Sequence, residues 1–137
     1  MNTNASVVVD TNVFVAAAFN ANSASARIVR AIGDNTVNMV WNDRTRDEIV
    51  FTISRIPLLS SKSVERLFRR DKKFEKKLNE EDYVSIEDPA DRKFAALAFE
   101  SNSTLISSDM HLLGKRRALK VTVLSPQEFS TRFLDNY

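Results

Sequence analysis

The sequence contains no cysteine, one histidine and two glycines among its 137 residues. The lack of cysteine excludes disulfide scaffolds, thiolate zinc sites and cysteine nucleophiles, and the single histidine, His111, excludes multi-histidine metal sites. With only Gly33 and Gly114, neither a GxGxxG turn nor a GxxxxGK[ST] phosphate loop can be written. A metal ion in this protein would therefore have to be held by oxygen ligands.

The sequence also has no long hydrophobic run and no large excess of either basic or acidic residues. The longest apolar run covers residues 13–19, whereas about 20 residues are needed to cross a bilayer. The chain begins without an early basic residue and its first apolar run ends at Asp10, unlike a signal peptide. Twenty basic and 18 acidic residues give a net charge of +2, too even a balance to identify a polyanionic partner. We expect one domain over residues 1–137, cytoplasmic and without a membrane partner.

Short β-branched runs alternate with longer stretches of helical periodicity, which is typical of an α/β fold. The expected strands cover residues 7–9, 37–41, 83–86, 104–106 and 121–123. The expected helices cover residues 13–18, 23–32, 44–55, 63–78, 92–101, 110–117 and 127–134. This pattern predicts a mostly parallel central sheet of about five strands flanked by helices.

Two acidic residues follow expected strands, where a parallel sheet opens its ligand crevice. Asp10 comes directly after the first strand, and Asp109 follows the fourth strand after two serines. Each also has a structural interpretation, as the cap of the helix that follows it. Their common position at the strand ends favours a shared site.

A third acid, Asp91, belongs to the first turn of a helix that Asp88 can cap and Pro89 can begin. Helical phase places Asp91 on the apolar side of this helix and directs Arg92 and Lys93 elsewhere. Asp91 alone has a simpler interpretation, as a first-turn acid favoured by the helix dipole. Three acids turned toward one crevice, without histidine or cysteine, instead predict a site for Mg²⁺ or Mn²⁺.

Four segments of the sequence carry a family resemblance. They are residues 7–13 (VVVDTNV), 88–94 (DPADRKF), 105–113 (LISSDMHLL) and 125–129 (SPQEF). In this order and spacing the chain resembles the PIN-domain ribonucleases, most closely the small single-domain toxins of prokaryotic toxin–antitoxin pairs. The resemblance covers nearly the whole chain and implies the PIN-like α/β fold.

The resemblance also implies a second acid, a glutamate in the helix after the second strand, which we assign to Glu48. Helical phase leaves Asp47 open, because Val50 widens the apolar stripe of Ile49 and Ile53 toward it. In the family, such acids are catalytic and hold one or two Mg²⁺ or Mn²⁺ ions. The four residues that the resemblance assigns to this role are Asp10, Glu48, Asp91 and Asp109.

Four neighbouring carboxylates repel one another and raise one another's pKa values, so the cluster favours a divalent cation. Setting these four negative charges aside raises the formal charge of the rest of the chain from +2 to +6. A metal-charged pocket on a basic body suits a phosphodiester chain. The resemblance implies an Mg/Mn-dependent endoribonuclease that leaves 5′-phosphate and 3′-hydroxyl ends. It makes RNA the substrate, an antitoxin protein a candidate partner and a homodimer a candidate assembly.

Two basic groups are candidates for RNA binding, although a solvated surface is the alternative for each. The helix expected at 63–78 has a basic face, and Asp71 on its apolar side indicates an irregularity there. The second group follows Asp109 in the sequence. The RNA-binding candidates are Arg66, Arg69 and Lys73 in the first group and Lys115, Arg116 and Arg117 in the second.

Three further polar residues lie next to the acids in the sequence: Thr11, Asn12 and Ser107. Their hydroxyl or amide dipoles can orient carboxylates and a metal-bound water, and helix capping is the alternative for all three. Both roles can coexist.

Two other classes of protein stay open. One is a catalytically silent PIN-fold module that binds RNA or a protein; the loss of any of the four acids would favour it. The other is a phospho-acceptor receiver domain, also a doubly wound sheet with acids at strand ends. A receiver needs an acidic pair ahead of its acceptor strand, and the pair Glu87-Asp88 comes too late in this chain.

Overall fold

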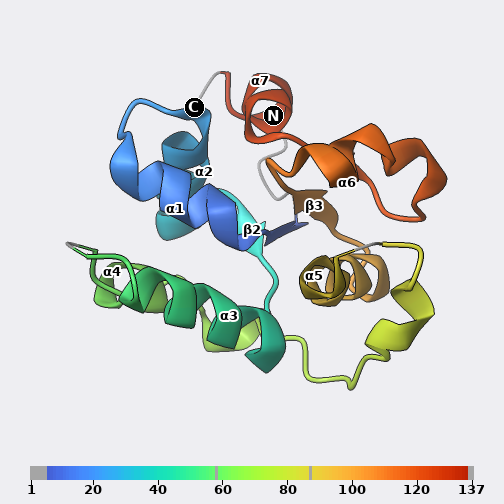
Figure 1. Cartoon of the computed structure of the whole chain (residues 1–137). Helices are drawn as coiled ribbons and strands as arrows, with labels where there is room; N and C mark the ends of the chain where they lie inside the picture. The colour runs from blue at the N-terminus through green and yellow to red at the C-terminus, as the bar shows by residue number, and fades with distance from the viewer. Residues whose placement is uncertain (1–5, 58, 87, 136–137) are drawn as a thin grey trace.

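The computed structural model describes residues 6–57, 59–86 and 88–135. Its strands form one parallel sheet in the order β2-β1-β3-β4. The strands are β1 (Ser6–Val9), β2 (Asn38–Met39), β3 (Thr104–Ile106) and β4 (Val123–Leu124). Helices cover both faces of this sheet (Figure 1), so the predicted α/β class is confirmed.

The two central strands, β1 and β3, are the apolar centre of the molecule. All three valines of β1 and both Leu105 and Ile106 of β3 are buried, as expected for parallel strands covered on both faces. The register pairs Val8 with Leu105 and Val9 with Ile106. Both strands therefore end at the same level, and the residues that follow them meet at one edge of the sheet.

The helices lie in two layers. In Figure 1, α1, α2 and α7 lie above the sheet, and α3 and α5 lie below it. Arg27 of α2 donates hydrogen bonds to the Ser130 hydroxyl and the Leu134 carbonyl, which holds α2 against α7. None of the helices in the described ranges is long and apolar enough to span a membrane. The helices are α1 (Thr11–Phe19), α2 (Ala24–Gly33), α3 (Asp43–Ser54), α4 (Lys62–Glu65), α5 (Pro89–Glu100), α6 (Met110–Gly114) and α7 (Pro126–Phe133).

The strand expected at residues 83–86 is wrong. This segment contains the end of a 3-10 helix, η2 (Glu80–Tyr83), followed by a turn. Ile86 is buried, but Val84 is 66% exposed, so the apolar run has one covered face and no partner strand. The sheet has four strands among the described residues instead of about five.

The helix expected at residues 63–78 is also wrong. Hydrogen bonds between Trp41 and this segment hold it in turns and an extended conformation instead. After α4 the chain forms turns and a short 3-10 helix, η1 (Arg70–Lys72), and then becomes extended. The Trp41 indole donates to the Arg69 carbonyl at 2.8 Å, and the Phe74 amide donates to the Trp41 carbonyl at 2.7 Å. The predicted irregularity at Asp71 falls in η1, where this side chain is exposed.

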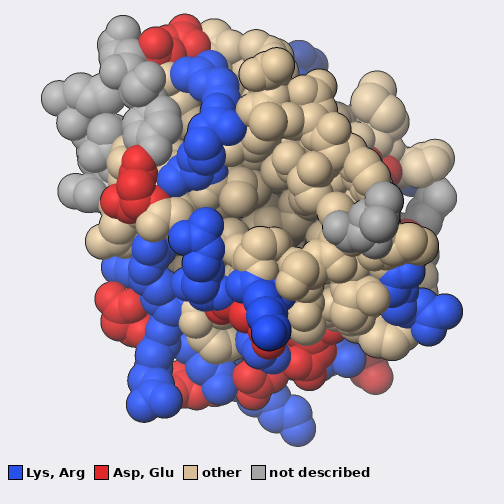
Figure 2. Space-filling view, turned by 90° about the vertical axis from the view of Figure 1, so that its left-hand side faces the viewer, with Lys and Arg blue, Asp and Glu red and all other residues tan. Residues whose placement is uncertain are grey.

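The basic residues of this segment consequently do not share one helix face. Figure 2 shows lysines and arginines interspersed with acidic side chains on this side of the molecule. The Lys73 ammonium lies 3.1 Å from Asp43 Oδ1 and 3.7 Å from Glu75 Oε1. The Arg69 guanidinium donates to the carbonyls of Ile32 and Gly33 at 2.7 and 2.8 Å. Arg69 thereby adds side-chain donors to two carbonyls at the end of α2, where the last carbonyls of a helix have no partner in the next turn.

We expect Arg69→Met to lower the free energy of unfolding by about 1–3 kcal/mol, because it removes two charge-assisted hydrogen bonds and keeps the apolar stem. Arg70→Met is the matched control: this neighbouring side chain is exposed, so its loss should change stability by less than about 0.5 kcal/mol. Urea unfolding of both variants measures the difference. Equal stability of the two variants would contradict the role of Arg69 at the end of α2.

Candidate active site

Asp10 occupies the end of β1 and is held there by the end of β3. Its backbone N–H donates to the Ile106 carbonyl at 3.0 Å, and the Ser107 hydroxyl donates to Asp10 Oδ2 at 2.7 Å. Ser107 is fully buried and Asp10 is 6% exposed. Asp10 precedes α1, yet its side chain makes no capping hydrogen bond to that helix. The carboxylate is therefore turned toward β3 instead of serving as a cap.

Burial raises the pKa of Asp10 above its usual value, and the nearby charges of Glu48 and Asp109 act in the same direction. Hydrogen bonds from Ser107 and from the Thr11 backbone oppose this rise. Asp10 is thus a desolvated acid held between other acids.

Asp91 and Asp109 form a pair of hydrogen-bonded carboxyls. Asp88 caps α5 by accepting from the Ala90 amide at 3.0 Å, and Pro89 begins the helix, as the sequence predicts. Asp91, in the first turn, is 9% exposed. Burial is the main cause that raises its pKa to about 7, and the hydrogen bond with Asp109 and the charge of Asp10 add to it. Asp91 therefore keeps its proton to a higher pH than an ordinary aspartate does, and the protonated carboxyl can donate to Asp109.

Asp109 has both roles that the sequence left open. Its side chain accepts from the His111 amide at 2.8 Å and so caps α6. Its own amide donates to the Ser107 hydroxyl at 3.0 Å. Ser107 therefore contacts two acids, Asp10 through its proton and Asp109 through its oxygen.

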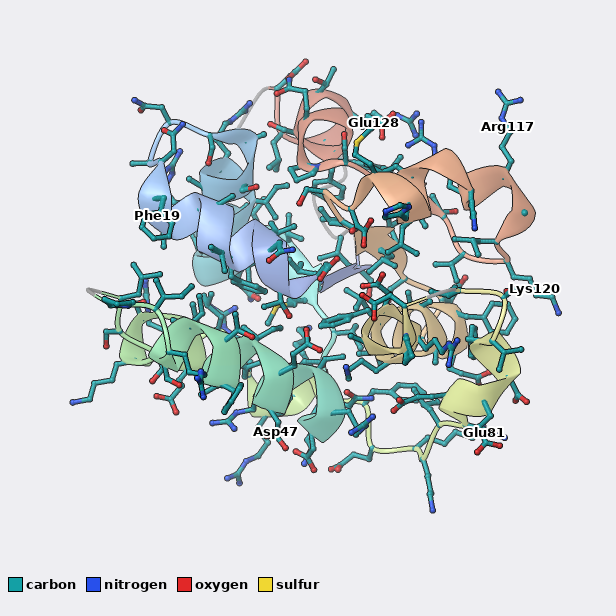
Figure 3. All side chains as sticks on the ribbon, viewed as in Figure 1. Phe19, Asp47, Glu81, Arg117, Lys120 and Glu128 are labelled. Carbon is teal, nitrogen blue, oxygen red and sulfur yellow. The ribbon has the colours of Figure 1, made fainter. Side chains whose placement is uncertain are left out.

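Glu48 reaches the same region from α3. This helix begins with a capping box formed by Asn42 and Thr45. Glu48 Oε2 accepts from the Thr11 hydroxyl at 2.5 Å, and Oε1 accepts from the Lys93 ammonium at 2.7 Å. Asp47 points away from the protein (Figure 3), with its side chain 74% exposed. The structure therefore brings Glu48, and not Asp47, to the other acids.

Lys93 is the residue of this site that the sequence analysis directed elsewhere. Its side chain is 11% exposed, and its ammonium contacts both Glu48 and the Ala90 carbonyl, the latter at 3.0 Å. Helical phase turns its Cα away from Asp91, but the four-carbon stem reaches across to α3. The available signal was a lysine two positions after an acid in the first turn of α5.

The other predicted residues are spread more widely. Asn12 is exposed on α1, and Arg66 is exposed after α4. Arg116 forms a two-pronged ion pair with Glu128 of α7, with N–O distances of 2.6 and 2.9 Å, which lowers the pKa of Glu128 to about 2. Arg117 points outward at the edge of the molecule (Figure 3). Lys115 lines a cavity together with Asp91 and Asp109.

The donor set fits a hard divalent cation. All four acids offer oxygen, the Lys93 ammonium contacts Glu48, and the pKa of Asp91 is raised to about 7. In the part of the chain that the structure describes, no three acidic or histidine side chains form a ready-made metal cage. Mg²⁺ keeps several of its waters and is commonly bound through one or two carboxylates, so such a cage is not required.

The geometry agrees with the comparison to known proteins. A family model described as the PIN domain matches residues 6–111. The chain belongs to the PIN domain family. PIN domains are generally nucleases that use divalent metal ions. The matched range contains all four acids of the site.

Two solved structures share the PIN fold of this chain. FitAB bound to an IR36 DNA fragment is 19% identical with a TM-score of 0.56, over 88% of this chain and 94% of that chain. FitAcB from Neisseria gonorrhoeae has the same identity and TM-score, over 88% of this chain and 98% of that chain. Among curated proteins, none matches the chain. The likeness to the two solved structures concerns the fold.

From the raised pKa of Asp91 we predict how the free energy of unfolding depends on pH in the absence of metal. Because the folded protein binds this proton more tightly than the unfolded chain, stability should fall as the pH rises from about 4 through about 7. Above that window the ionised carboxyl opposes folding. Asp91→Asn should therefore flatten the pH dependence and be more stable than the original protein near pH 8.

Urea unfolding in EDTA at about pH 5 and about pH 8 measures this effect. Asp47→Asn is the control, because it removes an exposed acid and should leave the pH dependence unchanged. If Asp91→Asn keeps the original pH dependence, Asp91 is not a protonated member of the cluster.

Proposed function

We propose that this PIN domain is an Mg²⁺- or Mn²⁺-dependent endoribonuclease. The observation that carries the proposal is that acidic side chains from separate parts of the chain lie near the ends of β1 and β3, where their charges help to raise the pKa values of Asp10 and Asp91. These acids are Asp10, Glu48, Asp91 and Asp109. Burying acids together is costly unless they are neutralised, so their collection at one edge of the sheet is better explained by function than by stability.

In this proposal the four carboxyls hold the cation. When bound, it would lower the pKa of a water molecule and stabilise the charge that develops on the phosphate. Ser107 holds Asp10 and Thr11 holds Glu48 through their hydroxyl protons. Asp91 would hold the cation in its ionised form, after release of its proton to water. The products would carry 5′-phosphate and 3′-hydroxyl ends.

A groove of about 510 Å³ beside the acids supports a polyanionic substrate. Lysines and one arginine line it, together with acidic residues of α3 and η2. Lys93 belongs both to this groove and to the acid cluster, so the groove reaches the cluster. The cations lining the groove are Arg44, Lys73, Lys76, Lys77 and Lys93.

RNA as the substrate rests on the resemblance to PIN-domain ribonucleases. The neighbour FitAB is described as bound to a DNA fragment, so single-stranded DNA is a necessary comparison in every assay. From the same resemblance we propose that the chain is a cytoplasmic toxin neutralised by an antitoxin protein, with a homodimer as a candidate assembly. Copurification with the product of an adjacent gene, followed by loss of nuclease activity, would support the antitoxin.

A catalytically silent PIN-fold module that binds RNA or a protein is the second candidate. It is favoured by one observation: the ammonium of Lys93 contacts Glu48 and offsets part of the acidic charge without a metal. A silent module would bind RNA equally well in EDTA and in Mn²⁺ and would leave it intact.

We expect Asp10→Asn and Asp91→Asn each to reduce RNA cleavage at least about 100-fold. Residues one step removed from a metal already cost about 10–100-fold, and these substitutions remove direct ligands while keeping the side-chain shape. Cleavage of structured and single-stranded RNA in Mn²⁺ or excess EDTA, with mapping of the ends, provides the measurement. Full activity of either variant would contradict the site.

Glu48→Gln and Asp47→Asn test the second acid as a matched pair of neighbours on α3. An amide in place of the Glu48 carboxylate keeps the shape but withdraws one negative charge from the cation, so Mn²⁺ affinity and turnover should fall together. Asp47→Asn should change neither, since its side chain is exposed. Calorimetric Mn²⁺ titration and cleavage rates under identical salt decide between them. If Glu48→Gln changes neither Mn²⁺ affinity nor cleavage rate, Glu48 is not a ligand and the site contains only the other three acids.

A further inference from the structure

A second cavity, of about 330 Å³, adjoins the acid pair and shares no lining residue with the basic groove. Asp91 and Asp109 form part of its wall, and Ile86, Leu112 and Leu119 supply apolar surface. Its volume is at the lower end of the range for small-molecule sites, which are mostly apolar with a few polar groups.

Polar groups surround the apolar surface. The side chains of Ser85 and His111 are exposed and line this cavity, and Lys115 lines it as well. A hydroxyl and an imidazole can each donate or accept a hydrogen bond. The cavity therefore combines apolar walls with adaptable hydrogen-bonding groups at its edge.

We propose that this cavity binds one nucleobase of the nucleotide next to the bond that is cut. The inference rests on the proposed nuclease function and adds a specificity site to it. A nucleobase has apolar faces and a hydrogen-bonding edge, and unpaired bases of RNA are recognised by packing of their faces and bonding of their edges. A phosphate at Asp91 and Asp109 brings the attached nucleoside to the mouth of this cavity.

The contrast between the two hollows decides which part of the strand each one takes. Five cations and four acidic residues line the basic groove, and the cations suit the phosphate backbone. In the second cavity the lining residues that are described include three acids, Asp88, Asp91 and Asp109, and one lysine, Lys115. Three aliphatic residues, Ile86, Leu112 and Leu119, supply its apolar walls. The strand would thus pass from the groove, over the acids, and place a base in the cavity.

Uncharged nucleosides test the cavity without cleavage and without metal. We expect at least one of adenosine, guanosine, cytidine and uridine to shift the backbone amide signals of Ser85, Leu112 and Leu119 in a saturable manner, in EDTA. Leu119→Ala should weaken this binding about 10-fold, since it removes an apolar wall. Phe99→Ala is the matched control, because Phe99 lines a neighbouring cavity that Leu119 shares but the acids do not.

Cleavage of a random RNA pool supplies the second measurement. The original protein should prefer certain bases at one position beside the cut, and Leu119→Ala should reduce that preference about 10-fold while Phe99→Ala keeps it. His111→Ala, an exposed substitution at the edge, provides a second variant if Leu119→Ala does not fold. Its expected effect is a smaller loss of the same preference.

The outcomes separate this inference from the proposed function. Cleavage without base preference, together with no saturable nucleoside binding, would contradict nucleobase binding in the cavity and would still support the nuclease function. Nucleoside binding without any cleavage supports the cavity and overturns the nuclease. Equal effects of Leu119→Ala and Phe99→Ala on both measurements overturn the cavity as a base site.

Discussion

The hydrogen bond from Ser107 to Asp10 joins the ends of β1 and β3, and the positions of the other acids depend on this junction. Since the two strands end at the same level, α1 begins at Thr11 beside Asp10 and α6 begins just after Asp109. Thr11 then reaches Glu48 on α3, and Asp109 reaches the acid in the first turn of α5. One pairing register in the central sheet therefore collects groups from four distant parts of the chain.

Desolvation of the carboxylates, together with repulsion between them, is the main energetic cost of bringing these acids together. Desolvated carboxylates are unfavourable, and proteins commonly respond by taking up protons or by pairing the charge. Here Lys93 pairs with Glu48, and the raised pKa of Asp91, about 7, lets this carboxyl take up a proton more readily than an ordinary aspartate. A cation that entered the proposed site would compete with the Lys93 ammonium and with the proton of Asp91. Its affinity would therefore depend on pH through the release of that proton.

The sequence predicted the parts of the site that local rules determine. Asp10 follows an apolar strand, and Asp88 and Pro89 begin α5 so that Asp91 faces inward; both expectations agree with the structure. Long-range contacts escaped it. The segment at 63–78 has helical periodicity, but hydrogen bonds to Trp41, which lies 28 positions before Arg69, change its course. Lys93 was misplaced because helical phase locates its Cα and not the end of its stem.

The long-range contacts of basic residues also escape prediction from the sequence, and this affects which of them can bind a nucleic acid. Arg69 and Arg116 satisfy carbonyls and an acid within the fold, so a cluster of cations in the sequence overstates the surface available to a nucleic acid. What matters is which cations lie on a path to the acids, and Lys93 belongs to both the groove and the cluster. Phosphate contacts position a nucleic acid and base contacts specify it. A charged groove and a cavity with three aliphatic residues, which adjoin the acids through different lining residues, would divide these two tasks at one reaction centre.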